Sequence, residues 1–98
     1  DTKISIATLA NICHLSPHRF NSLFKDIMGC PPHQYLLKMR LQKAMQLLSS
    51  SNASVSDIAK RLGFFDQPHF SRLFKTATGL NPSKYRKEIE RRLYIRAG

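Results

Sequence analysis

Acidic residues are scarce in this sequence: six Asp and Glu stand against sixteen Lys and Arg, which gives a formal net charge of +10 at pH 7. A positive excess of this size favours a polyanionic partner, with nucleic acid ahead of an anionic membrane surface. The sequence also has no glycine-rich phosphate loop and no Ser/Cys–His–Asp signature. We therefore expect a binding protein that is not an enzyme and needs no cofactor.

Other absences narrow the class further. No apolar run approaches the roughly 20 residues that span a bilayer, so we expect no membrane partner. Two cysteines are too few for a disulfide framework, which favours a reduced, cytoplasmic setting. Cys13, His14, Cys30 and His33 lack the close paired spacings of structural zinc ligands, so we predict no metal site. A chain of 98 residues that begins with Asp rather than Met indicates a fragment or a processed chain.

The secondary structure is predicted to be entirely helical. No segment shows sustained alternation of polar and apolar residues, which is the pattern of a half-buried strand. Helix boundaries are well marked instead, by N-capping side chains and by glycines at the ends of apolar stripes. The predicted N-caps are Ser5, Ser16, Ser54, Asp66 and Asn81, and the predicted helix stops are Gly29, Gly63 and Gly79.

The chain contains an internal repeat. LFKDIMGCPPHQY (residues 23–35) and LFKTATGLNPSKY (73–85) agree at six of thirteen positions, at a constant offset of 50. Upstream the offset is 49, so the second copy carries one extra residue in the turn GFFD (63–66). Each copy has a short helix, a turn, a second helix and Gly-x-x-Pro leading into a third, which is the pattern of a helix-turn-helix. The single domain 1–98 is thus predicted to hold two homeodomain-like three-helix subdomains, at about 5–31 and 54–94, joined by a long linking helix at about 32–49.

The second helix of each copy has an apolar stripe that should form its core. At the upstream repeat offset of 49, Cys13 takes the core position of Leu62, so we expect Cys13 to pack in the first core. The predicted stripes are Phe20, Leu23, Phe24 and Ile27 in the first copy, and Phe70, Leu73, Phe74 and Ala77 in the second.

The faces opposite these stripes carry groups that can recognise bases. In DNA-binding helix-turn-helix units the second helix enters the major groove and contacts bases from its N-terminal turns. Asn and Gln can pair bidentately with adenine and Arg with guanine, and neither face has a carboxylate to repel phosphate. The outward residues are His18, Asn21, Ser22 and Lys25 in the first copy, and Gln67, His69, Arg72 and Lys75 in the second.

Phosphate contacts would come from basic side chains and from helix N-termini. The hydroxyls of the capping serines lie where they could reach phosphate, although capping alone would also explain them. The candidates are Ser5, Ser16, Lys25, Lys38, Arg40, Ser54 and Lys75.

The stretch SVSDIAKRLGFFDQPHFSRLFKTATGLNPSKYR (54–86) resembles the DNA-binding domain of the AraC/XylS family of bacterial transcription regulators. It carries that family's Ile-Ala, Gly-Phe, aromatic-Ser-Arg, Phe-Lys, Gly-x-x-Pro and Tyr-Arg pattern, and RLQKAMQLL (40–48) resembles the family's linking helix. The family usually has a further helix before its first helix-turn-helix. Only residues 1–4 precede Ser5, so we expect that helix to be truncated and the first core to be thinner.

The resemblance implies sequence-specific binding of double-stranded DNA, with two recognition helices in successive major-groove segments. It implies contact with RNA polymerase, an effector or dimerisation domain elsewhere in the parent chain, and a place in the bacterial cytoplasm at the nucleoid. The base-reading residues that it implies are His18, Asn21, Ser22, Gln67, His69 and Arg72.

Two other functions stay open at this point. The chain could be a basic helical module that binds nucleic acid without sequence preference, or one that binds an acidic protein. Sequence-blind binding uses surface aromatics on which bases stack. Most Phe and Tyr fall on the core stripes, and Phe65 in the extra-residue turn is the exception. Its side chain is either exposed or covers the core. A protein-binding helical repeat usually needs at least three units, and only two are present.

Overall fold

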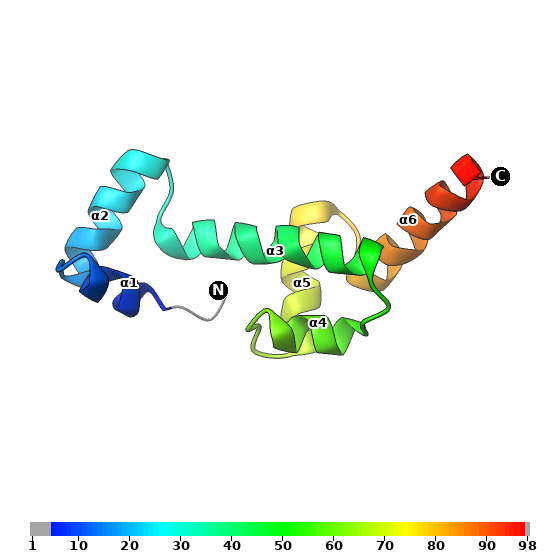
Figure 1. The fold of residues 1–98 in the computed structure, drawn as a ribbon, viewed down its shortest axis with the longest axis horizontal. Coiled ribbons are helices and arrows are strands. Elements are labelled where there is room, and N and C mark those ends of the chain that lie inside the picture. The colour runs from blue at the N-terminus through cyan, green and yellow to red at the C-terminus, as the bar shows by residue number, and fades with distance from the viewer. Residues whose placement is uncertain (1–4, 98) are drawn as a thin grey trace. The chain divides into compact units, whose positions relative to one another are not determined.

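The structure, a computed structural model, describes residues 5–97; residues 1–4, on which the expected truncation before Ser5 depends, and residue 98 lie outside that range. Over the described range the fold is all-α, as predicted, with six helices and no strand (Figure 1). None of these helices is long and apolar enough to cross a bilayer. The helices are α1 (Ile6–Ile12), α2 (Pro17–Met28), α3 (Pro32–Ser50), α4 (Val55–Arg61), α5 (Gln67–Thr78) and α6 (Pro82–Ala97).

The predicted helix boundaries are largely confirmed. Side-chain oxygens of Ser5, Ser16, Ser54 and Asp66 accept backbone N–H bonds at four N-termini, as capping residues do. Gly29 and Gly79 end α2 and α5 with φ of 85° and 86°, a left-handed conformation that glycine adopts without strain. Two ends run further than expected, since α3 reaches Ser50 and α6 reaches Ala97.

The chain forms two compact units, residues 1–40 and residues 41–98, and α3 contributes to both. In the first unit α1 packs on α2. Its buried apolar side chains are Ala10 and Phe20, with Pro32 at the start of α3. The rings of Phe20, Phe24 and Tyr35 follow one another at centroid distances of 5.8 and 5.5 Å.

The second unit repeats this arrangement with a larger core. Here α4 packs on α5, and α5 on α6. The rings of Phe70, Phe74 and Tyr85 follow one another at 5.7 and 5.2 Å, and Phe64 adds a fourth ring 4.8 Å from Phe70. The buried apolar side chains are Leu41, Ala44, Leu48, Ile58, Ala59, Leu62, Phe64, Phe70, Phe74 and Pro82.

Three predicted core residues lie on the surface instead. Ile27 is 78% exposed and its counterpart Ala77 is also exposed, so the apolar stripe stops one turn before each helix ends. The seven-residue helices α1 and α4 rise about 10 Å and cannot cover all of a twelve-residue neighbour. Cys13 is exposed where Leu62 is buried. The second unit includes residues 41–50 of α3, and Leu41, Ala44 and Leu48 of this segment are buried in its core.

Candidate nucleic-acid interface

The first recognition-helix candidate is α2. Ser16 Oγ accepts the backbone N–H of Arg19 at 3.2 Å, and Pro17 opens the helix where an N–H would have no partner. With Phe20 turned into the core, His18, Asn21 and Lys25 are exposed together at helical spacing. Ser22 is half-buried, so its hydroxyl is less accessible than the sequence pattern predicted.

The second candidate is α5, which begins in the same way. Asp66 Oδ1 accepts the backbone N–H of His69 at 2.8 Å. Gln67 in the first turn, Arg72 in the middle and Lys75 in the last turn are all exposed. The N-terminus of an α-helix presents backbone N–H groups that have no partner within the helix. Together with the side chains of the first turn, these groups can donate hydrogen bonds to phosphate and to acceptor atoms of bases.

His69 differs from the other predicted base-reading residues because its ring is half-buried. The ring lies against Phe64, with the two centroids 6.4 Å apart and the planes at 68°. Its Nδ1 is buried, and no hydrogen-bond partner for it is found among residues 5–97. Phe64 in turn packs on Phe70, so the setting of the His69 ring depends on a residue outside α5, which helical spacing alone could not show.

The phosphate-contact candidates have different settings. The hydroxyls of Ser5, Ser16 and Ser54 accept cap bonds from Thr8, Arg19 and Asp57 at 3.1, 3.2 and 3.0 Å. A hydroxyl that accepts a cap bond still has its own proton to donate. The Ser5 hydroxyl also shares a hydrogen bond with Thr8 Oγ1 at 2.9 Å. On α3, Lys38 is exposed and Arg40 is half-buried.

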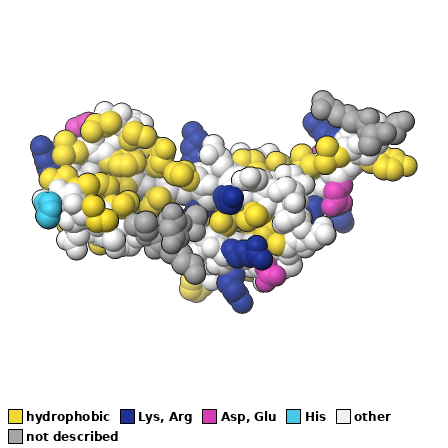
Figure 2. All heavy atoms as spheres, in the orientation of Figure 1, with side chains coloured by type: hydrophobic (Ala, Val, Ile, Leu, Met, Phe, Trp, Pro, Cys, Tyr) yellow, Lys and Arg dark blue, Asp and Glu magenta, His cyan; other side chains and the backbone are white. Residues whose placement is uncertain are grey.

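Sequence reasoning missed Arg19, which is exposed in the first turn of α2. The repeat offers the signal, because at the offset of 50 Arg19 is the counterpart of His69. Lys60 and Arg61 in the last turn of α4 were also not singled out. Both are exposed, and Figure 2 shows Lys and Arg side chains gathered over α4.

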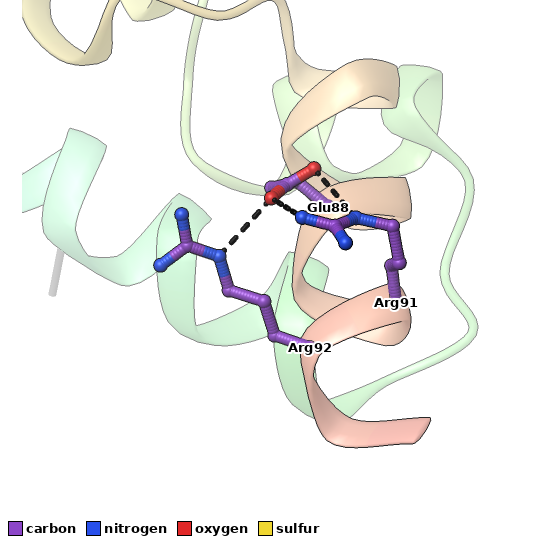
Figure 3. Close-up of polar contacts among 3 residues, drawn as sticks. All are labelled: Glu88, Arg91 and Arg92. Atoms are coloured by element: carbon purple, nitrogen blue, oxygen red, sulfur yellow. Dashed lines mark hydrogen bonds and ion pairs between the residues drawn. The ribbon is translucent and has the colours of Figure 1, made fainter. Parts of the chain in front are cut away.

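Two arginines of α6 are held by a carboxylate. Glu88 accepts bonds from Arg91 at 2.7 and 3.3 Å and from Arg92 at 3.1 Å (Figure 3). The hydrogen bond from Arg91, and to a smaller extent the one from Arg92, lowers the pKa of Glu88 to about 2. Because both guanidinium groups are shared with Glu88, we do not count them among the phosphate contacts. In the described part of the chain, no three His, Cys, Asp or Glu side chains gather as metal ligands would.

The comparisons with known proteins agree with this arrangement. A family model described as a helix-turn-helix domain matches residues 9–88. The chain is 33% identical over 93 residues to the arabinose operon regulatory protein of Escherichia coli, covering 95% of this chain and 32% of that protein. It is 39% identical over 87 residues to the MmsAB operon regulatory protein of Pseudomonas aeruginosa, covering 89% of this chain and 28% of that one.

Among solved structures, the DNA-binding domain of AdpA, a global transcriptional factor, in complex with a target DNA, has a TM-score of 0.86. The identity is 30%, and the match covers 92% of this chain and 81% of that one. The fold and its paired polar faces therefore define a helix-turn-helix DNA-binding domain of a transcriptional regulator. More particularly, the chain belongs to the AraC family. It spans about a third of the length of the curated relatives that it matches.

Proposed function

We propose that this domain binds double-stranded DNA sequence-specifically, with α2 and α5 in successive major-groove segments of one duplex. The observation that carries the proposal is the doubled unit: each second helix has a capped N-terminus and an exposed face that carries basic and amide side chains. The net charge of +10 supplies the general attraction to a polyanion.

Base recognition is assigned to residues in the N-terminal halves of the two helices. Arg72 is the strongest candidate, because an exposed guanidinium can pair bidentately with O6 and N7 of guanine. Asn21 and Gln67 suit adenine. His18, Ser22 and His69 supply adaptable hydrogen bonds, with His69 limited to what its half-buried ring leaves accessible.

The remaining candidates hold the DNA backbone and set the register. Lys25 and Lys75 lie in the last turns of the two recognition helices, on the same faces as the base-reading residues. On α3, Lys38 and Arg40 contribute charge. The capping hydroxyls of Ser5, Ser16 and Ser54 donate to phosphate in addition to capping.

The parent protein is proposed to be a bacterial transcription regulator that acts at the nucleoid in the cytoplasm. The two operon regulators described above are about three times as long as this chain, which leaves room for an effector or dimerisation domain. Contact with RNA polymerase would couple DNA binding to transcription.

The test is selection of binders from a random duplex pool at moderate salt, with the intact chain. Two sequence blocks about one helical turn apart are expected if both helices read bases. A single short block would mean that only one helix does, and binding without enrichment would favour the sequence-blind alternative.

Salt dependence tests the electrostatic part separately. For the selected duplex, the logarithm of affinity should fall linearly with the logarithm of salt concentration, with a slope of roughly −0.9 per phosphate neutralised. Affinity that does not change with salt would rule out the DNA-binding proposal. Preference for an acidic protein over duplex DNA at equal salt would favour the protein-binding alternative.

A further inference from the structure

The turn before α5 contains a residue that the turn before α2 lacks. The backbones of the two turns correspond as far as Leu15 and Phe64. Leu15 N–H donates to Ala10 O at 2.9 Å, and Phe64 N–H to Ala59 O at 3.0 Å. In the first copy the capping Ser16 follows at once, whereas in the second Phe65 comes between Phe64 and the capping Asp66.

This extra residue is an aromatic side chain that the fold does not bury. Phe65 is 89% exposed, although the adjacent Phe64 packs into the core against Phe70. Phe65 lies at the edge of a hollow of about 250 Å³, whose lining includes Lys60 of α4 and Gln67 of α5. The fold leaves this ring accessible beside the hollow and next to the N-cap of α5, where it can contact a ligand.

The position of Phe65 identifies the ligand group. It directly precedes the N-cap of α5 and is two residues from Gln67, so it belongs to the end of the recognition helix that approaches base edges. A phenyl ring has no hydrogen-bonding group, so at the edge of a paired base its contact is apolar. The apolar group that bases present in the major groove is the C5-methyl of thymine.

We propose that Phe65 contacts the C5-methyl of a thymine in the block read by α5, and so determines specificity at that base pair. The proposal rests on the proposed function, because it requires α5 to lie in the major groove. Lys60, exposed beside the same hollow, is placed to contact a neighbouring phosphate. The first copy has no counterpart of Phe65, so the preference should be confined to one of the two blocks.

The experiment removes the methyl group and the ring separately. Each thymine of the selected duplex is replaced in turn by deoxyuridine, and affinities are measured by fluorescence anisotropy for the intact chain and for Phe65→Ala. At one thymine in the second block, uracil should weaken binding by the intact chain about fourfold, the value of one buried methyl group. Phe65→Ala should weaken binding to the thymine duplex to a similar degree and should no longer distinguish uracil from thymine there.

Controls separate this contact from other roles of Phe65. Thermal unfolding of Phe65→Ala should match that of the intact chain, because the side chain is exposed. Phe65→Leu should keep part of the thymine preference through its apolar side chain. Equal uracil effects in the intact chain and Phe65→Ala would overturn the proposal while leaving specific binding intact.

Two further outcomes would also overturn it. Equal weakening by Phe65→Ala on every duplex and on single strands would indicate base stacking, and no change on any DNA would leave the ring to a protein partner. If no duplex is preferred in the first place, the proposed function itself fails, and this is visible before any variant is made.

Discussion

Phe70 and Phe74 of the second unit are fully buried, whereas the matching Phe20 is 9% exposed and Phe24 only half-buried in the first. The helices, caps and ring spacings of the two copies are nearly the same, so local structure does not explain the difference. Burial differs because the second unit adds Phe64 and the 41–50 part of α3 to its core. On the face drawn in Figure 2, hydrophobic side chains gather over α1 and α2.

The second unit also carries more positive charge than the first. Residues 1–40 contain five Lys and Arg and two Asp and Glu, and residues 41–98 contain eleven and four. The unit with the larger core therefore also carries more of the positive charge. The comparison shows that a repeated pattern can specify the same helices twice, while the burial of each core also depends on residues outside the pattern.

The largest expected effect is the loss of stability when a phenyl ring is removed from either core. Phe70→Ala should lower the free energy of unfolding of the second unit by about 3–5 kcal/mol, because it leaves a cavity where no solvent now reaches. Phe20→Ala should lower that of the first unit by about 3 kcal/mol or less, since its site is already partly open. Amide hydrogen exchange resolved by helix would measure both, and equal losses would contradict the proposed difference in packing.

The next prediction concerns the stability that a clamp gives to the second unit; the clamp consists of two hydrogen bonds from Arg86 to backbone carbonyls. Arg86 donates from Nε to Leu48 O at 3.0 Å and from its terminal guanidinium to Ser51 O at 3.1 Å, at the end of α3. Its counterpart in the first copy is Leu36, which has no donor. Arg86→Leu should therefore destabilise the second unit by about 2 kcal/mol, because two carbonyls lose a charged partner. Arg86→Lys is the control that keeps the charge, and denaturant unfolding is the measurement; no loss in Arg86→Leu would show that water replaces the clamp.

The repeat and the helix boundaries could be predicted from the sequence because capping and helix stops are local. Ser16 and Gly29 act within a few residues of themselves, so their roles can be read directly. Cys13 and Ile27 were misplaced because burial depends on what another element covers, and helical spacing carries no information on that. Among the site residues, the exposure of Asn21 and Arg72 followed from spacing, but the inward packing of His69 depends on Phe64.

Substitutions in the two recognition helices should lower DNA affinity by different amounts, and the difference should be smaller than the stability effects above. Arg72→Ala is expected to cost about 1–3 kcal/mol on the selected site and to relax preference at one base pair. Asn21→Ala should have the smaller effect, about 1 kcal/mol, because fewer buried neighbours hold α2 in place. Competition binding against single-base variants of the site measures both. If Arg72→Ala weakens every sequence equally, Arg72 contacts phosphate rather than a base.

A backbone difference between the turns predicts a gain in stability. His14 has φ of 57°, a left-handed conformation, where the second copy has Gly63 at 81°. Side chains with a Cβ are disfavoured there, so His14→Gly should stabilise the first unit by about 1 kcal/mol. The matched reverse change, Gly63→His, should destabilise the second unit by a similar amount. Urea unfolding of both variants checks the pair, and a loss of stability in His14→Gly would mean that the imidazole makes a compensating contact.

The smallest expected effect is a pH dependence of stability that arises from Glu88 in the second unit. Its counterpart in the first copy is Lys38, at the repeat offset of 50. Because Arg91 and Arg92 lower the pKa of Glu88 from 4.5 to about 2, these two ion pairs stabilise the folded chain above pH 4.5. That contribution should disappear as the pH falls from 4.5 to about 2, because Glu88 is protonated over this range.

Carbon-13 NMR of the Glu88 carboxyl group would give the midpoint of this titration. Glu88→Gln should remove the pH dependence while leaving the first unit unchanged. The two arginine side chains are largely solvent-exposed and that of Glu88 is 33% exposed, so 1 M salt should raise the midpoint toward 4.5. A midpoint near 4.5 at low salt would mean that the ion pairs do not persist in solution.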